Sequence, residues 1–178
     1  MPGPAIREAA RADVAAMLGI YAPIVAETAI SFEDRVPGDA EFADRVRRYR
    51  ATHAWLVAED ADGVAGYAYG SPHRTRGAYR WCTEVTVYVA ERARGRGVGR
   101  ALYGALLPVL AGRGYVMAYA GIALPNPASV ALHEACGFTP VGVFRNAGYK
   151  LGAWHDIGWW QRPLADPPPV PGEVPPTG

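Results

Sequence analysis

Residues 94–99 read Arg-Gly-Arg-Gly-Val-Gly, between a stretch typical of a strand and a stretch typical of a helix. Upstream, Thr83–Val89 reads Thr-Glu-Val-Thr-Val-Tyr-Val and is rich in β-branched residues. Downstream, apolar residues recur at helical spacing: Leu102, Leu106, Val109 and Leu110. A glycine loop that opens a helix presents unpartnered N–H groups and the positive end of the helix dipole. The segment therefore predicts a site for a phosphate-bearing ligand.

Two better-known phosphate loops do not fit this segment. A P-loop needs Lys-Ser/Thr directly after its last glycine, where Arg100-Ala101 stand here. The dinucleotide fingerprint needs Gly-x-Gly-x-x-Gly near the start of a βαβ unit, but Gly95, Gly97 and Gly99 alternate strictly and lie past mid-chain. We expect Gly97 and Gly99 to let the backbone approach a phosphate without a Cβ in the way.

Length and composition predict one globular domain over residues 1–162. The chain has 178 residues, half of them apolar, and a net charge of +1, which argues against nucleic acid as a partner. Cys82 and Cys136 lack zinc-type spacing and the four histidines form no metal cluster, so we expect reduced thiols, no metal and a cytoplasmic protein. No apolar run resembles a signal peptide or reaches membrane-spanning length. Residues 163–178 hold seven of the sixteen prolines and predict an extended or disordered tail.

Periodicity predicts an α/β (α+β) fold with a central mixed sheet flanked by helices. Four helices are expected: one through Val14–Tyr21, one after the N-cap Asp39, one over Gly99–Ala111 with a mild kink at Pro108, and one after Asn126-Pro127. The expected strands are Ala5–Glu8, Ala54–Glu59, Val64–Tyr69, Trp81–Val89, Tyr115–Ala123, Thr139–Arg145 and Trp154–Arg162.

The strand Trp81–Val89 has two unlike faces. Alternation places Val85, Val87 and Val89 on one face, which should pack on a helix. The other face carries Glu84, Thr86 and Tyr88, which predicts the floor of a site.

With these motifs the chain resembles the GCN5-related N-acetyltransferase (GNAT) superfamily. Arg94, Gly97 and Gly99 match its cofactor signature Arg/Gln-x-x-Gly-x-Gly/Ala. Within it, the chain is most similar to phosphinothricin and methionine sulfoximine N-acetyltransferases. The matching stretches are Ile30-Ser31-Phe32-Glu33, Thr86-Val87-Tyr88-Val89, Leu132-His133-Glu134-Ala135, Ala147-Gly148-Tyr149-Lys150 and Trp154-His155-Asp156-Ile157-Gly158. The resemblance implies a mostly antiparallel sheet of six or seven strands with about four helices, acetyl-CoA as cosubstrate, and a homodimer.

The resemblance also implies which residues hold acetyl-CoA. The pantetheine arm is expected along Val87–Val89 and at Asn126 and Ser129, and the pyrophosphate on the loop Gly95–Arg100. The full expected set is Val87, Tyr88, Val89, Arg94, Gly95, Arg96, Gly97, Val98, Gly99, Arg100, Asn126 and Ser129.

Two residues are candidates for proton transfer. Glu84 matches the catalytic Glu of the family and lies on the polar face of its strand, so we expect it to be the general base, directly or through a water; the alternative is a Glu satisfied by an Arg. His133 stands where many members have a Tyr that protonates the thiolate, and its ordinary pKa of about 6.5 suits that role. The alternative for His133 is a satisfied core residue.

The acceptor is expected to contact Phe32, Arg76, Tyr79 and Lys150. Arg76 and Tyr79 match substrate positions of the subfamily, and a guanidinium binds an oxyanion bidentately. Lys150 is a second candidate cation. Ordinary surface charges remain the alternative for both cations. Residues 72–77 depart from the phosphinothricin enzymes, which puts the preferred acceptor in doubt more than the reaction.

The predicted function is transfer of an acetyl group from acetyl-CoA to the α-amine of a small amino-acid analogue. One alternative in the same fold acetylates protein N-termini or another amine. Another is a non-catalytic acyl-CoA-binding module, which need keep neither Glu84 nor His133.

Overall fold

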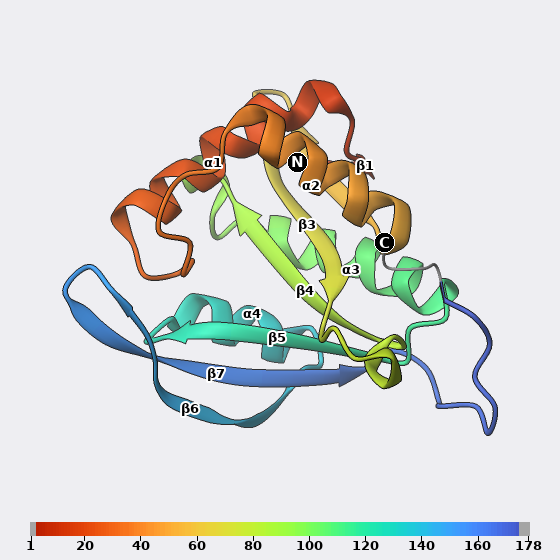
Figure 1. Cartoon of the computed structure of the whole chain (residues 1–178). Coiled ribbons are helices and arrows are strands. Elements are labelled where there is room, and N and C mark those ends of the chain that lie inside the picture. The colour runs from red at the N-terminus through yellow and green to blue at the C-terminus, as the bar shows by residue number, and fades with distance from the viewer. Residues whose placement is uncertain (1–2, 175–178) are drawn as a thin grey trace.

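A seven-stranded sheet organises the molecule, in the order β1-β2-β3-β4-β5-β7-β6 (Figure 1). The computed structural model describes residues 3–174. The strands are β1 (Ala5–Glu8), β2 (Trp55–Asp60), β3 (Gly63–Pro72), β4 (Cys82–Val89), β5 (Met117–Leu124), β6 (Thr139–Lys150) and β7 (Ala153–Pro163). Neighbouring strands are antiparallel except for the parallel pair β4 and β5. The predicted fold class is thereby confirmed.

Helices cover the two faces of the sheet differently. α1 (Val14–Glu27) and α2 (Asp39–Thr52) pack over β2–β4 on one face, and α3 (Val98–Gly112) and α4 (Pro127–Ala135) lie on the other (Figure 1). Short 3-10 turns follow Ala10, Arg76 and Ala90 and are η1 (Arg11–Asp13), η2 (Gly77–Tyr79) and η3 (Glu91–Ala93). On the face of α1 and α2, the half of the sheet made by β5 and β7 carries neither helix.

The alternation of side chains along each strand divides the core in two. Leu102, Leu106 and Leu110 of α3 pack with Val85 against the face that carries α3. Aromatic residues fill the core under α1 and α2: Tyr21, Phe42, Trp55 and Tyr67. β4 thus buries Val85 on one side and presents Glu84 on the other, as its sequence predicts.

One local prediction differs from the structure. β6 extends to Lys150 instead of ending near Arg145, and its pairing with β7 shifts between Phe144 and Gly148. Asp156 spans this irregularity, accepting from the Arg145 side chain at 2.6 Å and from the Asn146 N–H at 2.8 Å. α3 runs through Pro108 to Gly112, as predicted for this helix, and the mild kink expected at Pro108 stays a prediction.

The described part of the proline-rich tail lies against the domain. The Leu164 N–H donates to Val116, and the Trp81 Nε1–H donates to the Gly172 carbonyl at 2.8 Å. Val174 is buried and its side chain lies close to Gly114. Composition predicts an extended chain here, and these contacts hold the tail against the domain as far as Val174. Residues 175–178 of the predicted tail lie outside the described residues.

Candidate active site

The parallel strands β4 and β5 separate after a short paired stretch (Figure 1). Only three residue pairs join them, and the last is Glu84 with Tyr119. Beyond that point β4 pairs with β3 alone, within the described part of the chain. The edge of β4 at Val87–Val89 is therefore open to an extended ligand, and this is the segment where the sequence predicts the pantetheine arm.

The glycine loop has the conformation that an anion site needs. Gly95 and Gly97 adopt positive φ values of 73° and 79°, and Gly97 is the residue before the first turn of α3. No atom lies within 4 Å of where a side chain on either glycine would begin. The N–H groups at the start of α3 are thus accessible to a phosphate, with Arg94, Arg96 and Arg100 exposed around them. The residues fit the pyrophosphate of acetyl-CoA.

Gly99 has a different role from the one its place in the motif suggests. It is buried, and a Cβ there would lie 2.8 Å from the Leu132 side chain of α4. The glycine thus allows α3 and α4 to pack closely, which corrects the expectation that Gly99 opens the backbone to phosphate.

Asn126 caps α4 as the sequence predicts. Its Oδ1 accepts a hydrogen bond from the Ser129 N–H at 3.2 Å, and Pro127 occupies the first helical position. Gly137, with φ of 83°, follows the end of the helix. Cofactor contacts by Asn126 and Ser129 remain predictions.

Glu84 is paired with a histidine for which the sequence predicts no role. Its Oε1 lies 2.9 Å from Nδ1 of His73, the first residue after β3. Burial raises the pKa of Glu84, and the hydrogen bond from His73 opposes that effect. Glu84 keeps 32% of its side chain exposed, so it remains accessible. The alternative for Glu84 was an Arg partner, and the structure has His73 at the carboxylate instead. Because the loop from β3 to β4 is irregular, sequence spacing alone does not place the histidine there.

His133, the second candidate, has both ring nitrogens occupied. Nδ1 lies 2.7 Å from the Ser129 carbonyl and Nε2 lies 2.8 Å from the Tyr103 hydroxyl. The residue is 4% exposed, and burial lowers its pKa. In this geometry Nδ1–H donates to Ser129 and Nε2 accepts from Tyr103, which favours the alternative of a satisfied core residue joining α4 to α3.

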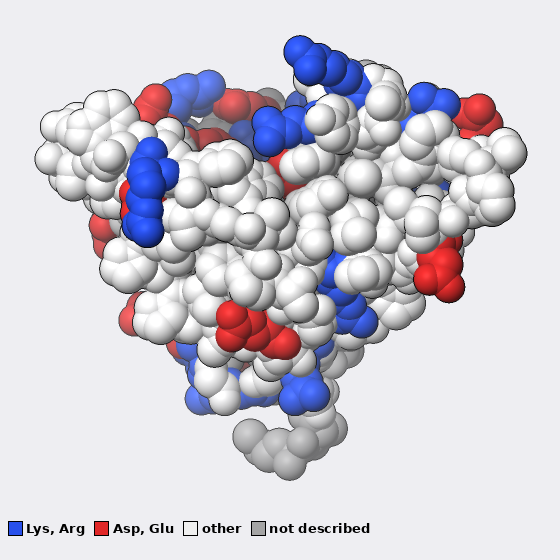
Figure 2. Space-filling view, turned by 90° about the horizontal axis from the view of Figure 1, so that it is seen from below, with Lys and Arg blue, Asp and Glu red and all other residues white. Residues whose placement is uncertain are grey.

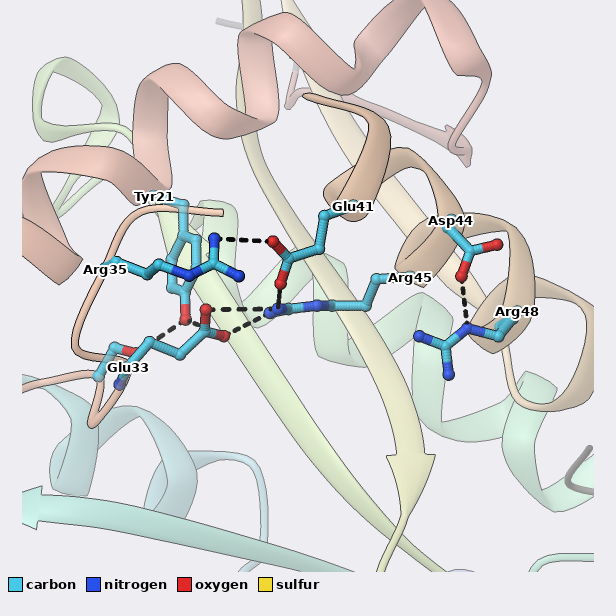
Figure 3. Close-up of polar contacts among 8 residues, drawn as sticks. Tyr21, Glu33, Arg35, Glu41, Asp44, Arg45 and Arg48 are labelled. Carbon is cyan, nitrogen blue, oxygen red and sulfur yellow. Dashed lines mark hydrogen bonds and ion pairs between the residues drawn. The ribbon is translucent and has the colours of Figure 1, made fainter. Parts of the chain in front are cut away.

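The segment between α1 and α2 carries Phe32 and is fixed by an ionic network (Figure 3). Arg45 of α2 holds both carboxylate oxygens of Glu33, and the Tyr21 hydroxyl donates to Glu33 at 2.9 Å. Burial alone would raise the pKa of Glu33, but the bonds from Arg45 and Tyr21 outweigh it and the pKa is lowered. Glu33 therefore stays ionised and keeps the segment in place.

Lys150 supports the same segment from the other side. Its buried Nζ donates to the Ser31 carbonyl at 2.6 Å and to the Val25 carbonyl at 2.7 Å. The predicted role as a substrate cation therefore loses its support, because the ammonium group faces the backbone. Phe32 rests on Gly148, where a Cβ would lie 2.2 Å from its ring.

Arg76 and Tyr79 stand in the loop that leads into β4. Tyr79 is partly exposed and contacts His73 edge-on at 5.8 Å between ring centroids. The Arg76 side chain is exposed and has no hydrogen bond to another described residue. The structure therefore brings Tyr79, His73 and Glu84 together and leaves the Arg76 guanidinium available.

Other features of the described residues lie apart from this region. Among the described residues, no group of three His, Cys, Asp or Glu side chains is placed to bind a metal ion. None of the described helices is long and apolar enough to span a membrane. A hollow of about 660 Å³ between α1 and α2 is lined by residues such as Arg11, Val14 and Arg47, and it contains none of the predicted site residues.

Comparison with known proteins agrees with this geometry. The family profile of the acetyltransferase (GNAT) domain matches residues 6–159. A phosphinothricin N-acetyltransferase from Streptomyces viridochromogenes is 42% identical, over 92% of this chain and 90% of its own length. An L-methionine sulfoximine/L-methionine sulfone acetyltransferase from Salmonella typhimurium is 35% identical, over 89% of this chain and 94% of its own. A crystal structure of a GNAT superfamily phosphinothricin acetyltransferase from Sinorhizobium meliloti, in complex with AcCoA, has a TM-score of 0.92 at 35% identity, covering 99% of this chain and 97% of that one.

Proposed function

The chain belongs to the GNAT acetyltransferase family and is an acetyl-CoA-dependent N-acetyltransferase, and we propose that its acceptor is the α-amine of a small amino-acid analogue such as phosphinothricin or methionine sulfoximine. One observation carries the proposal: Glu84 is the last residue of β4 that pairs with β5, so its carboxylate stands where the opening between the strands begins. A base at that point lies between the expected thioester and an acceptor approaching over β5.

Glu84 removes the proton that prevents the acceptor from reacting, directly or through a water. Only a neutral amine is nucleophilic, and the burial of Glu84 makes its carboxylate a stronger base than an exposed one. The transfer forms the amide C–N bond and breaks the thioester C–S bond. Of the two protons that the ammonium loses, the first passes through Glu84 to solvent, and the second leaves the nitrogen after the C–N bond has formed and protonates the departing thiolate. Backbone N–H groups along Val87–Val89 are our candidates for stabilising charge on the thioester oxygen.

Three side chains are proposed to select the acceptor. Arg76 binds an anionic or strongly polar tetrahedral head group, because a guanidinium offers two parallel donors. Phe32 and Tyr79 are partly exposed and provide apolar contact for a short methylene stem. Glutamate, whose head group is flatter and smaller, is expected to react more slowly.

Steady-state thiol release separates this proposal from its alternatives. Phosphinothricin and methionine sulfoximine should give higher kcat/KM than glutamate or a peptide with a free N-terminus. Preference for the peptide would favour a protein-acetylating enzyme. Acetyl-CoA binding without turnover on any of the four would favour a non-catalytic acyl-CoA-binding module.

We also propose a homodimer formed through the β6–β7 hairpin. β6 is an edge strand, and the hairpin exposes large apolar side chains, including Leu151 at 61% and Trp154 at 63%. The surface seen from the side of these strands carries few charged residues (Figure 2). Exposed apolar edges of this kind mark interaction sites. Light scattering should show a dimer that Trp154→Glu weakens; a wild-type monomer at assay concentration would contradict it.

The compartment that we propose is the cytoplasm. Cys82 and Cys136 are both free thiols, as is usual in a reducing environment. Fractionation of the native host should recover the enzyme in the same fraction as cytoplasmic markers.

A further inference from the structure

His73 is held in one orientation beside Glu84. Its ring stacks on Tyr119 of β5 with centroids 4.3 Å apart and meets the edges of Tyr79 and Trp159 at 5.8 Å and 5.9 Å. Only 10% of the His73 side chain is exposed. Three aromatic neighbours from different segments therefore restrict the imidazole, and Nδ1 points at Oε1 of Glu84.

This contact uses one carboxylate oxygen and leaves the other. His73 is the only described side chain that hydrogen-bonds the Glu84 carboxylate, and it does so at Oε1. Since an ionised carboxylate is a pure acceptor, Nδ1 must be the donor. Oε2 then remains able to accept a proton from an ammonium group or a water.

We propose that His73 is a positioning residue for acetyl transfer: its Nδ1–H holds the Glu84 carboxylate in its ionised form and directs Oε2 to the acceptor. The inference rests on the proposed function, because it takes Glu84 to be the base. The inference also goes beyond that function, because it makes the reactivity of Glu84 depend on His73. This histidine lies in residues 72–77, the segment that departs from the phosphinothricin enzymes.

The surrounding groups explain why one hydrogen bond matters. Burial raises the pKa of Glu84, whereas His73 and the more distant Arg74 lower it. Other titratable side chains near the pair are Tyr119 and Tyr79, which contact His73, and Cys82, two positions before Glu84 on β4. Burial raises the pKa of both Tyr119 and Cys82, so these two side chains stay neutral and place no charge beside Glu84. Without His73, Glu84 would take up a proton at higher pH and lose its function as a base.

Two substitutions of His73 test this role. His73→Phe keeps a ring against Tyr119 and removes the donor; His73→Asn keeps an N–H near the position of Nδ1. Thiol release should be measured from about pH 5.5 to about pH 9. In His73→Phe we expect kcat to fall about tenfold or more, the acceptor KM to change little, and the acid limb of kcat to move to higher pH. His73→Asn should recover most of both effects.

A Glu84→Gln background provides the matched control. Adding His73→Phe there should lower kcat no further, because the base that His73 serves is gone. An unmoved acid limb in His73→Phe, or a loss confined to KM, would overturn the positioning role and leave His73 as a packing residue. Wild-type turnover in Glu84→Gln alone would instead refute the proposed base, so the two failures are distinguishable.

Discussion

Lys150 donates from its buried Nζ to the backbone oxygen of Ser31, 2.6 Å away and 119 positions earlier in the chain. This bond joins the end of β6 to the segment that carries Phe32, and a second bond, to the Val25 carbonyl, joins it to α1. The lysine therefore acts on the acceptor side through the backbone of that segment.

Replacing this lysine should affect every acceptor alike. Lys150→Met leaves two buried carbonyl groups without their donor, so we expect a stability loss of about 1–3 kcal/mol and a kcat/KM about tenfold lower for anionic and neutral acceptors. Urea unfolding and steady-state kinetics on both acceptor types measure these effects. A loss restricted to anionic acceptors would return Lys150 to the substrate-binding set.

Arg76→Ala should raise the KM for acceptors with an oxyanion head group about tenfold or more. A lost charge-assisted hydrogen bond costs on the order of 1.5–3 kcal/mol. Arg11→Ala, in the hollow between α1 and α2, is the matched control and should leave KM unchanged. Equal KM values for both variants on phosphinothricin would remove Arg76 from the acceptor site.

Glu84→Gln should lower kcat by about 10²–10⁴-fold while the Kd for acetyl-CoA stays within error. The amide keeps the size of the side chain and loses its basicity. Calorimetric titration with acetyl-CoA separates binding from turnover. Normal turnover in Glu84→Gln together with an inactive His133→Ala would show that Glu84 is not the base and that His133 takes part in catalysis.

Gly97→Asp should weaken acetyl-CoA binding much more than Gly97→Asn. Both side chains tolerate positive φ better than other residues, so the pair differs mainly in the charge set against the pyrophosphate. We expect at least a tenfold difference in Kd, which falls as salt is added. Equal dissociation constants in two folded variants would move the cofactor away from this loop.

His53 should make the fold sensitive to acid. Burial, mainly, lowers the pKa of His53 to about 4, from an ordinary value of about 6.5. As the pH falls below about 6.5, His53 becomes protonated in the unfolded chain but stays neutral in the folded chain. The free energy of unfolding therefore decreases, by up to about 3 kcal/mol by about pH 4. Urea unfolding of His53→Phe should show a shallower decrease, with His133 supplying part of what remains. Parallel curves would contradict this assignment.

Local rules predicted much of the fold because the deciding contacts lie within a few residues. Asn126 and Pro127 start α4, and Gly137 follows its end. The two faces of β4 follow from simple alternation, which is why the sequence predicts the face on which Glu84 lies.

Contacts between distant segments explain what the sequence did not predict. His73 reaches Glu84 only because an irregular loop returns it to the sheet beside Tyr119. In the sequence Lys150 resembles a surface cation, because nothing local shows that its ammonium group bonds the Val25 carbonyl of α1. Arg145, Asn146 and Gly148 interrupt the apolar alternation and conceal the continuation of β6, where Asp156 across the hairpin binds Arg145 and Asn146. The role of Gly99 depends on Leu132 of α4, whose side chain lies where a Cβ at Gly99 would be.

The contact between Phe32 and Gly148 has an evolutionary consequence. Any side chain at position 148 would begin 2.2 Å from the ring, so position 148 can be enlarged only if the Phe32 ring or the segment that carries it moves. Descendants of this chain that acquire a new acceptor by enlarging position 148 should carry a smaller residue at position 32. The two sites are therefore expected to be inherited as a pair, and a drift in substrate preference should be traceable to their joint substitution.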